Sequence, residues 1–315
     1  MKYFNLYAHN LLVTGKSRSA IYNFKDNTIH FVPNILSQIL KGIEYQTYND
    51  YISSFNSREQ QLMEKYFKFL LQNDLGFFTD NTNRFPRLSF DWYSPFKVSR
   101  SSVEIDMAEN TLSVVLTQLD ELGCRYIEMI SSREKIRISD FNNLIQLTEG
   151  KIFRSITLLI KYSSQLNEAQ MKNWAMDFGK LSRLVIYCSP FQKEIVENFI
   201  KIEYREENIS QMKSKRPRYI INYKYFCESL NYNPYYNRRI CVSSDGSIKN
   251  CLSHKKSFGN VKTTKLKDVI SDSEFTDLWY ASPDKITDIK DSELRYCLYL
   301  DYKLIKIGSD LYRFS

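Results

Sequence analysis

The sequence predicts an α/β protein, with a partial (β/α) barrel or an open parallel sheet in the middle of the chain. Apolar runs that suit buried strands alternate with helical patterns between residues 98 and 223. The predicted strands are residues 103–107, 126–130, 155–160, 184–188 and 219–223. After the first of them, apolar residues recur at helical spacing, at Leu112, Val115, Leu116 and Leu119. This alternation is typical of parallel β-α units, whose sites lie at the carboxyl ends of the strands.

Residues 1–82 are predicted to form a winged-helix-like α+β module. Residues 19–24 and 28–32 are β-rich runs separated by a short polar turn, as in a hairpin. A helix is expected after Pro33, because proline is tolerated in a first turn. Ser57 and Gln60 have capping-box spacing for a second helix that ends before Gly76. The expected apolar face of this second helix is Leu62, Tyr66, Phe69 and Leu70.

A strand at the edge of this module could accept a further strand from a bound peptide. Unpaired N–H and C=O groups on an edge strand are a template for main-chain hydrogen bonds. We therefore predict that the hairpin lines a peptide groove. The candidate peptide-binding residues are Ser19, Ile21, Tyr22, Phe24, Ile29 and Phe31.

Residues 83–97 have the composition of a linker, and Phe90 and Trp92 within it are expected to pack the two neighbouring domains together. The net charge of +8 favours an acidic partner. The densest basic run, Lys213 to Arg218, is expected to be a solvated connector, and without a recognisable binding module we expect no nucleic-acid partner. No stretch approaches 18 apolar residues, so no membrane partner is expected and a cytoplasmic location is predicted.

Residues 224–315 are predicted to form a third domain, rich in Tyr and Asn. It holds four of the six cysteines, namely Cys227, Cys241, Cys251 and Cys297. The pair Asp245-Gly246 suits a tight hairpin turn between two of these cysteines. Six cysteines in 315 residues are too few for a secreted disulfide scaffold, so they are interpreted as reduced thiols or as former metal ligands.

This third domain resembles the SPASM domain, the cluster-binding module of radical SAM peptide maturases. The pattern of that domain is Gly-x4-Cys and, after a gap, Cys-x2-Cys-x5-Cys-x3-Cys. Gly246 and Cys251 fit the first part, and the stretch KDSELRY, residues 290–296, fixes the register of the second. The cluster positions then fall on Ile289, Ser292, Leu298 and Tyr302, none of them a cysteine. Because a four-iron cluster is held by about four thiolates, the resemblance implies the scaffold without the cluster.

The middle domain resembles a radical SAM core in the same incomplete way. A radical SAM barrel carries Cys-x3-Cys-x2-Cys after its first strand, whereas residues 107–111 contain no cysteine. The Gly-Gly-Glu-Pro type loop that follows the second strand in that family is replaced by residues 131–135. Over nearly the whole chain, the sequence is similar to the SPASM-domain peptide maturase of grasp-with-spasm systems. That resemblance implies two partners, a short precursor peptide and an ATP-grasp ligase that joins side chains of this peptide.

Together these features predict an accessory protein of peptide maturation, without a cofactor and without radical chemistry of its own. It would bind the leader part of the precursor and assist the ligase. An alternative is a metal- or iron–sulfur-dependent peptide-modifying enzyme with altered ligands, in which Cys227, Cys241, Cys251 and Cys297 hold zinc or a residual cluster. Inert buried thiols are the simpler interpretation. Asp106 and Glu128, near the ends of the first two predicted strands, are a candidate catalytic pair.

Overall fold

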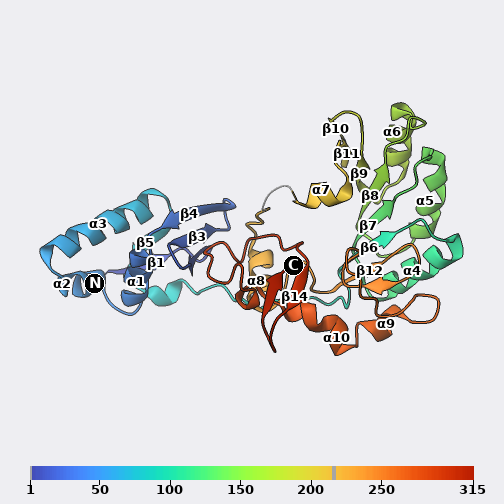
Figure 1. Ribbon diagram of the computed structural model, residues 1–315. Coiled ribbons are helices and arrows are strands. Elements are labelled where there is room, and N and C mark those ends of the chain that lie inside the picture. The colour runs from blue at the N-terminus through green and yellow to red at the C-terminus, as the bar shows by residue number, and fades with distance from the viewer. Residues whose placement is uncertain (1, 215–217) are drawn as a thin grey trace.

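The computed structural model describes residues 2–214 and 218–315 and places three parts of the chain in a row (Figure 1). The N-terminal module lies at one end, and an eight-stranded sheet with its helices lies at the other. The C-terminal segment and α8 (Tyr223–Asn231) lie between them. The basic run predicted to be a connector, Lys213 to Arg218, includes residues 215–217, which lie outside the described residues.

The N-terminal module combines two small antiparallel sheets with three helices. The strands are β1 (Tyr3–Leu6), β2 (Asn10–Thr14), β3 (Ser19–Asn23), β4 (Thr28–Val32) and β5 (Gly76–Thr79). They form a three-stranded sheet in the order β2-β3-β4 and a two-stranded sheet of β1 and β5. The helices are α1 (Asn34–Gly42), α2 (Tyr48–Ser53) and α3 (Ser57–Gln72). The predicted hairpin and the two predicted helices are therefore confirmed.

The start of α3 differs by one residue from the prediction. The side chain of Asn56 accepts backbone N–H bonds from the first turn, and Glu59 accepts the backbone N–H of Asn56 in return. The capping box predicted at Ser57 and Gln60 is therefore wrong, because asparagine caps a helix as well as serine does. The buried face is rotated accordingly, to Met63, Phe67 and Leu70.

The middle of the chain forms an open sheet in the order β10-β11-β9-β8-β7-β6-β12-β13. Its strands are β6 (Arg100–Glu104), β7 (Tyr126–Ser131), β8 (Ser155–Lys161), β9 (Leu181–Tyr187), β10 (Lys193–Glu197), β11 (Ile200–Tyr204), β12 (Arg239–Val242) and β13 (Ile248–Lys249). The six inner strands are parallel, and β10 and β13 pair antiparallel at the two edges. The predicted α/β class, with a mostly parallel sheet, is confirmed.

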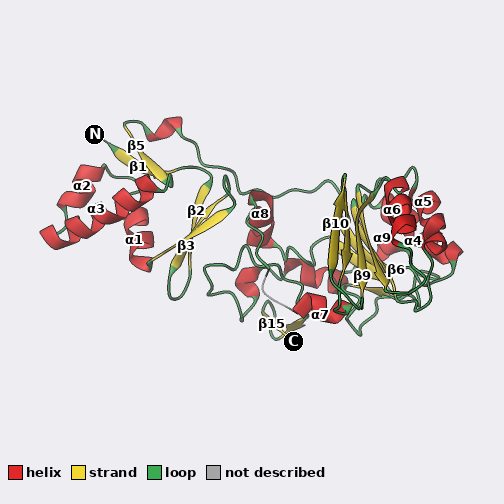
Figure 2. Cartoon of the chain, turned by 90° about the horizontal axis from the view of Figure 1, so that it is seen from above, coloured by secondary structure: helices red, strands yellow, loops and turns green. Residues whose placement is uncertain are grey.

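Helices cover one face of this sheet (Figure 2). They are α4 (Glu109–Glu121), α5 (Asn142–Thr148) and α6 (Glu168–Asp177). The four apolar residues predicted to form the inner face of the first helix, Leu112, Val115, Leu116 and Leu119, are all buried on α4. They belong to the main hydrophobic core, so the helical spacing in the sequence gave the packing face of α4 correctly.

The predicted strands at residues 126–130 and 155–160 lie within β7 and β8, and the one at residues 184–188 overlaps β9, which ends one residue earlier at Tyr187. The first predicted strand lies three residues earlier than expected, at Arg100–Glu104. The strand predicted at residues 219–223 is wrong. Tyr219 forms only an isolated bridge with Leu298, and Tyr223 already begins α8, where the Asn222 side chain caps the helix by accepting the N–H of Tyr225.

The C-terminal part of the chain supplies two strands to the large sheet. β12 and β13 extend the large sheet, so residues 239–249 pack with the middle of the chain, and the turn between them is the predicted hairpin turn. Gly246 has φ +85 there, and a Cβ at this position would lie 2.8 Å from Oδ1 of Asn260. The remaining elements are α7 (Ile209–Ser214), α9 (Leu266–Val269), α10 (Ser273–Thr276), β14 (Leu304–Lys306) and β15 (Tyr312–Phe314). Within the described residues, no helix is long and apolar enough to cross a membrane.

Candidate functional site

A peptide strand can add only to a free strand edge, and β3 has none. It lies in the middle of the three-stranded sheet and is paired along its length with both β2 and β4. The candidate residues Ser19, Ile21 and Tyr22 are on β3 and fully buried. Strand addition to β3 is therefore excluded by the pairing, although the sequence pattern made its edge a candidate. Of the candidate residues, Ile29 and Phe31 are on the edge strand β4.

One face of β3 is covered by the C-terminal part of the chain. The hydroxyl of Tyr22 donates a hydrogen bond to the backbone oxygen of Glu293 at 2.8 Å. The Tyr22 and Phe24 rings both meet the ring of Phe226 on α8, with centroids 5.6 and 5.4 Å apart. Burial raises the pKa of Tyr22 well above its usual value, so the hydroxyl stays protonated and donates. Tyr22 and Phe24 therefore fasten the N-terminal module to the C-terminal part.

The stretch KDSELRY supplies the polar half of the same interface. Nε of Arg18 lies 2.6 Å from Oε1 of Glu293, whose side chain is only 9% exposed. The backbone oxygen of Asp291 accepts the N–H of Lys16 at 2.8 Å, and Nη1 of Arg295 donates to the backbone oxygen of Thr14 at 3.0 Å. The residues that give this stretch its family resemblance therefore hold the N-terminal module in place.

Asp284 fixes the two side chains at the end of this stretch. Its carboxylate accepts from Nε of Arg295 at 2.7 Å and from the hydroxyl of Tyr296 at 2.8 Å. The guanidinium of Arg295 also lies over the ring of Tyr296, 4.4 Å from its centroid. Arg295 and Tyr296 are thus held in one orientation relative to β2, the strand whose last residue is Thr14.

The four predicted cluster positions carry packing and backbone contacts. Ile289 is buried in the main core and Leu298 packs against it. Ser292 accepts the backbone N–H of Leu294, and the Tyr302 ring lies 4.6 Å from that of Phe314. None of the four is a cysteine, the residue whose thiolate holds an iron–sulfur cluster.

The four candidate metal-binding cysteines are all buried. Cys227 is on α8, and Cys297 donates to the backbone oxygen of Leu294 beside Tyr22. Cys241 donates to the backbone oxygen of Asn250, while Cys251 lies 3.5 Å from the hydroxyl of Tyr235. Across residues 2–214 and 218–315, no three His, Cys, Asp or Glu side chains form a group that could hold a metal ion.

Burial also determines the protonation of two groups in the C-terminal part, Cys297 and His254. Burial raises the pKa of the Cys297 thiol to about 11, which keeps it protonated at neutral pH. Burial also lowers the pKa of His254 to about 4, and its Nε2 lies 3.2 Å from the hydroxyl of Tyr236. His254 is therefore neutral at pH 7 and engaged with a tyrosine.

The candidate catalytic pair is not brought together as a pair. Asp106 follows β6 and accepts hydrogen bonds from the hydroxyl of Ser131 and the N–H of Ser132, both at 2.6 Å. It also pairs with Arg133 at 3.1 Å. Glu128 lies in the middle of β7 and accepts from the hydroxyl of Ser102 at 3.2 Å. The carboxylate at the carboxyl end of the sheet thus anchors the loop that follows β7.

A cleft of about 1170 Å³ lies against the N-terminal module. All five residues of β2 line it, and so does the linker from Thr82 to Leu88. Further lining comes from residues 4–9 of β1 and the turn after it, from the end of α1, from α8 and from the C-terminal residues Arg295 and Tyr296. The sequence did not single out β2, whose residues look like an ordinary strand until the folded chain places the linker opposite them.

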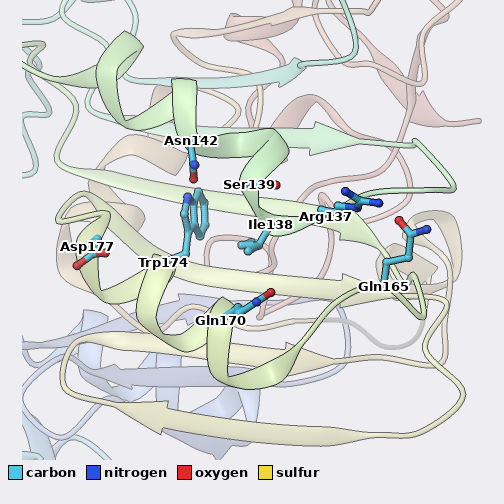
Figure 3. A pocket seen from close by; sticks show the side chains of 8 residues that line it. All are labelled: Arg137, Ile138, Ser139, Asn142, Gln165, Gln170, Trp174 and Asp177. Atoms are coloured by element: carbon cyan, nitrogen blue, oxygen red, sulfur yellow. The ribbon is translucent and has the colours of Figure 1, made fainter.

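A second, smaller pocket of about 560 Å³ lies beside the helices of the middle domain (Figure 3). Its side chains come from residues 137–142 and from residues 165–177 around α6. The indole N–H of Trp174 has no hydrogen-bond partner in the described part of the chain. The polar side chains of the lining are mixed in charge and kind, Arg137, Ser139, Asn142, Gln165, Gln170 and Asp177, and they select no single ligand chemistry.

The described residues define an α/β protein whose N-terminal antiparallel module is docked on its C-terminal part. No family model and no curated protein matches the sequence. Among solved structures, the chain is similar to Streptococcus suis SuiB, at 10% identity over 93% of this chain and 94% of SuiB, with a TM-score of 0.38. SuiB bound to S-adenosylmethionine matches at 12% identity over 87% and 89% of the two chains, with a TM-score of 0.33. SuiB bound to precursor peptide SuiA matches at 11% identity over 87% and 89%, with a TM-score of 0.26.

Proposed function

We propose that this protein takes part in the maturation of a ribosomally synthesised peptide. It binds the precursor peptide at its N-terminal module and assists an ATP-grasp ligase that crosslinks side chains of that peptide. The observation that carries the proposal is the three-stranded sheet β2-β3-β4, whose outer strands each keep one edge without a strand partner among the described residues. An added strand gains affinity from main-chain hydrogen bonds and selectivity from side-chain pockets.

The rest of the chain suits a scaffold for this binding. Tyr22, Arg18 and Glu293 tie the module to the C-terminal part, so a bound peptide is held at a fixed place relative to the large sheet. The protein performs no radical chemistry in this proposal, since residues 107–111 contain no cysteine that could hold the cluster this chemistry needs. The net charge of +8 suits an acidic peptide.

Co-expression tests the proposal directly. The precursor and the ligase are produced with and without this protein, and the peptide is analysed by mass spectrometry. We expect a loss of one water per ester or amide crosslink that depends on the protein. Equal crosslinking in its absence would overturn the accessory role. Iron or zinc bound in stoichiometric amount, with peptide modification in the absence of the ligase, would support the metal-dependent enzyme instead.

A further inference from the structure

The strand β2 presents backbone groups that the sheet does not use. Phe24 N–H donates to the oxygen of His9, and Gly15 N–H donates to the oxygen of Arg18. In an antiparallel pair, hydrogen-bonded and non-hydrogen-bonded positions alternate, so residues 9, 11, 13 and 15 face β3. Asn10, Leu12 and Thr14 therefore turn their backbone groups to the other side.

Most of this outward edge is available. The backbone oxygen of Thr14 already accepts a hydrogen bond from Nη1 of Arg295, and the N–H of Asn10 donates to the backbone oxygen of Tyr7. Within residues 2–214 and 218–315, no hydrogen bond reaches the N–H or C=O of Leu12 or the N–H of Thr14. These groups lie in the middle of the edge and are spaced as an added antiparallel or parallel strand requires.

The cleft along this edge is large enough for an extended chain. Its volume of about 1170 Å³ exceeds the roughly 300–1,000 Å³ that is usual for a small-molecule pocket. The linker forms the opposite wall with three large apolar side chains that remain exposed, Phe85 at 48%, Leu88 at 39% and Phe90 at 38%. Side chains that alternate along a bound strand would meet this wall with every second residue. No residue of β4 lines this cleft.

The charges of the cleft select the kind of peptide. The lining residues include four cations, Lys41, Arg84, Arg87 and Arg295, and one carboxylate, Glu44. Arg87 pairs with Glu44, and Arg295 pairs with Asp284. For Lys41 and Arg84, the described residues supply no ion-pair partner. Two uncompensated cations beside a strand edge favour a segment that carries acidic side chains.

We propose that β2, and not β4, is the strand to which an extended acidic segment of the precursor peptide adds, with the linker residues 82–90 closing over it. This inference rests on the proposed function and specifies where and how the precursor is held. The bound segment forms main-chain hydrogen bonds with the N–H and the C=O of Leu12. It places acidic side chains near Lys41 and Arg84.

The test uses the full-length protein and the fluorescein-labelled precursor peptide, with binding followed by fluorescence anisotropy. Leu12→Pro removes the outward N–H and leaves the β2–β3 ladder intact, because proline is tolerated on the open side of an edge strand. Ile29→Pro is the matched control on β4, where the pairing with β3 turns Ile29 outward in the same way. We expect Leu12→Pro to weaken binding about tenfold, the effect of one lost hydrogen bond and a disturbed neighbour. Ile29→Pro should change the affinity by less than about twofold.

A crosslinking measurement covers the case in which Leu12→Pro does not fold. A photoreactive benzoylphenylalanine placed at Leu88 should crosslink to the precursor, and the same group at Phe31 should not. Charge is tested by comparing Lys41→Gln/Arg84→Gln with Lys262→Gln/Lys267→Gln, which changes the net charge equally at two exposed positions remote from the cleft. Only the first pair should weaken binding at low salt and flatten its salt dependence.

The outcomes separate the two proposals. If the wild-type protein binds no precursor, the proposed function fails. If the wild-type protein binds the precursor, but Ile29→Pro weakens binding and the group at Phe31 crosslinks to the peptide, the function stands and the assignment to β2 is wrong. If neither proline variant changes binding and neither position crosslinks, the peptide binds away from this sheet and the inference is overturned.

Discussion

The ion pair between Arg18 and Glu293 should contribute measurably to docking of the N-terminal module. The perturbation is a double-mutant cycle of Arg18→Ala, Glu293→Gln and the double variant. The Glu293 side chain is 9% exposed and that of Arg18 is 49% exposed, with 2.6 Å between Nε and Oε1. The pair is therefore intermediate between a surface ion pair and a buried one.

The magnitude follows from that position. Exposed pairs contribute roughly 0.2–1 kcal/mol, whereas hydrogen bonds to charged groups contribute roughly 1.5–3 kcal/mol. We expect a coupling energy of about 1–2 kcal/mol. Arg18→Ala alone should cost about 2 kcal/mol, because it leaves the Glu293 carboxylate buried without its partner. It also removes the contact of the guanidinium with the Phe31 ring, 3.7 Å from the ring centroid.

The cycle is measured by urea unfolding of the four proteins at low and high salt. Thiol labelling of Cys297, which is buried beside Tyr22 at the interface, reports docking separately from global stability, since an undocked module exposes this side chain. The coupling energy should fall at high salt because the arginine is half-exposed. Additivity of the two single substitutions within about 0.5 kcal/mol would refute the reasoning.

Three further predictions concern Glu203, Tyr22 and the six cysteines. Burial alone would raise the pKa of Glu203, but hydrogen bonds from Arg183 and Arg205 lower it to about 2. A lowered native pKa adds stability above the unfolded value of about 4.3 and loses it as pH falls toward 2. Glu203→Gln should therefore lower the free energy of unfolding, measured with urea at pH 7, by about 2 kcal/mol. The difference between wild type and variant should shrink between pH 5 and 2, and a pH-independent difference would contradict the lowered pKa of Glu203. Tyr22→Phe should lower the free energy of unfolding by about 1 kcal/mol and weaken precursor binding no more than Arg18→Ala does, because Tyr22 acts through docking alone. A larger loss of affinity would restore Tyr22 as a peptide contact. At pH 8 a thiol reagent should modify Cys188 rapidly, since it alone of the six cysteines is exposed, and modify the others only after denaturation; a second fast thiol would disprove the burial.

In the large sheet, the strands that the sequence predicted correctly are those rich in buried apolar side chains. β8 and β9 contain buried apolar runs at residues 158–160 and 184–187, as expected for the middle of a parallel sheet, and β7 buries Ile127, Met129 and Ile130. The start of β6 escaped prediction because its buried residues include Ser101 and Ser102, whose hydroxyls look like loop chemistry. The wrong strand prediction at residues 219–223 has a related cause. Ile221 is apolar because it packs against the cluster of Tyr22, Phe226 and Tyr296, and it belongs to no sheet.

The sequence placed a candidate peptide site in the N-terminal module, and the structure changes which strand of that module has an open edge. In β3, both alternating sets of side chains are buried, with Ile21 in the core of the module and Tyr22 against the C-terminal part. A strand pattern shows that two faces are apolar, but it does not say what covers the second face. Only the folded chain shows that the second face of β3 is an internal contact, which moves the candidate peptide edge to β2 or β4.

Residues 289–298 contain two sets of side chains with different partners. Ile289 belongs to the main core and Leu298 packs against it, whereas Glu293, Arg295 and Tyr296 contact the N-terminal module. The polar residues of this segment therefore have a structural role in docking that needs no cluster. Arg295 and Tyr296 also line the cleft along β2. In the proposed binding mode these two side chains couple peptide binding to docking. Arg18→Ala, which touches no residue of the cleft wall directly, should then weaken binding of the precursor as well as docking. Unchanged affinity with a loosened module would show that the cleft does not need the C-terminal part to bind.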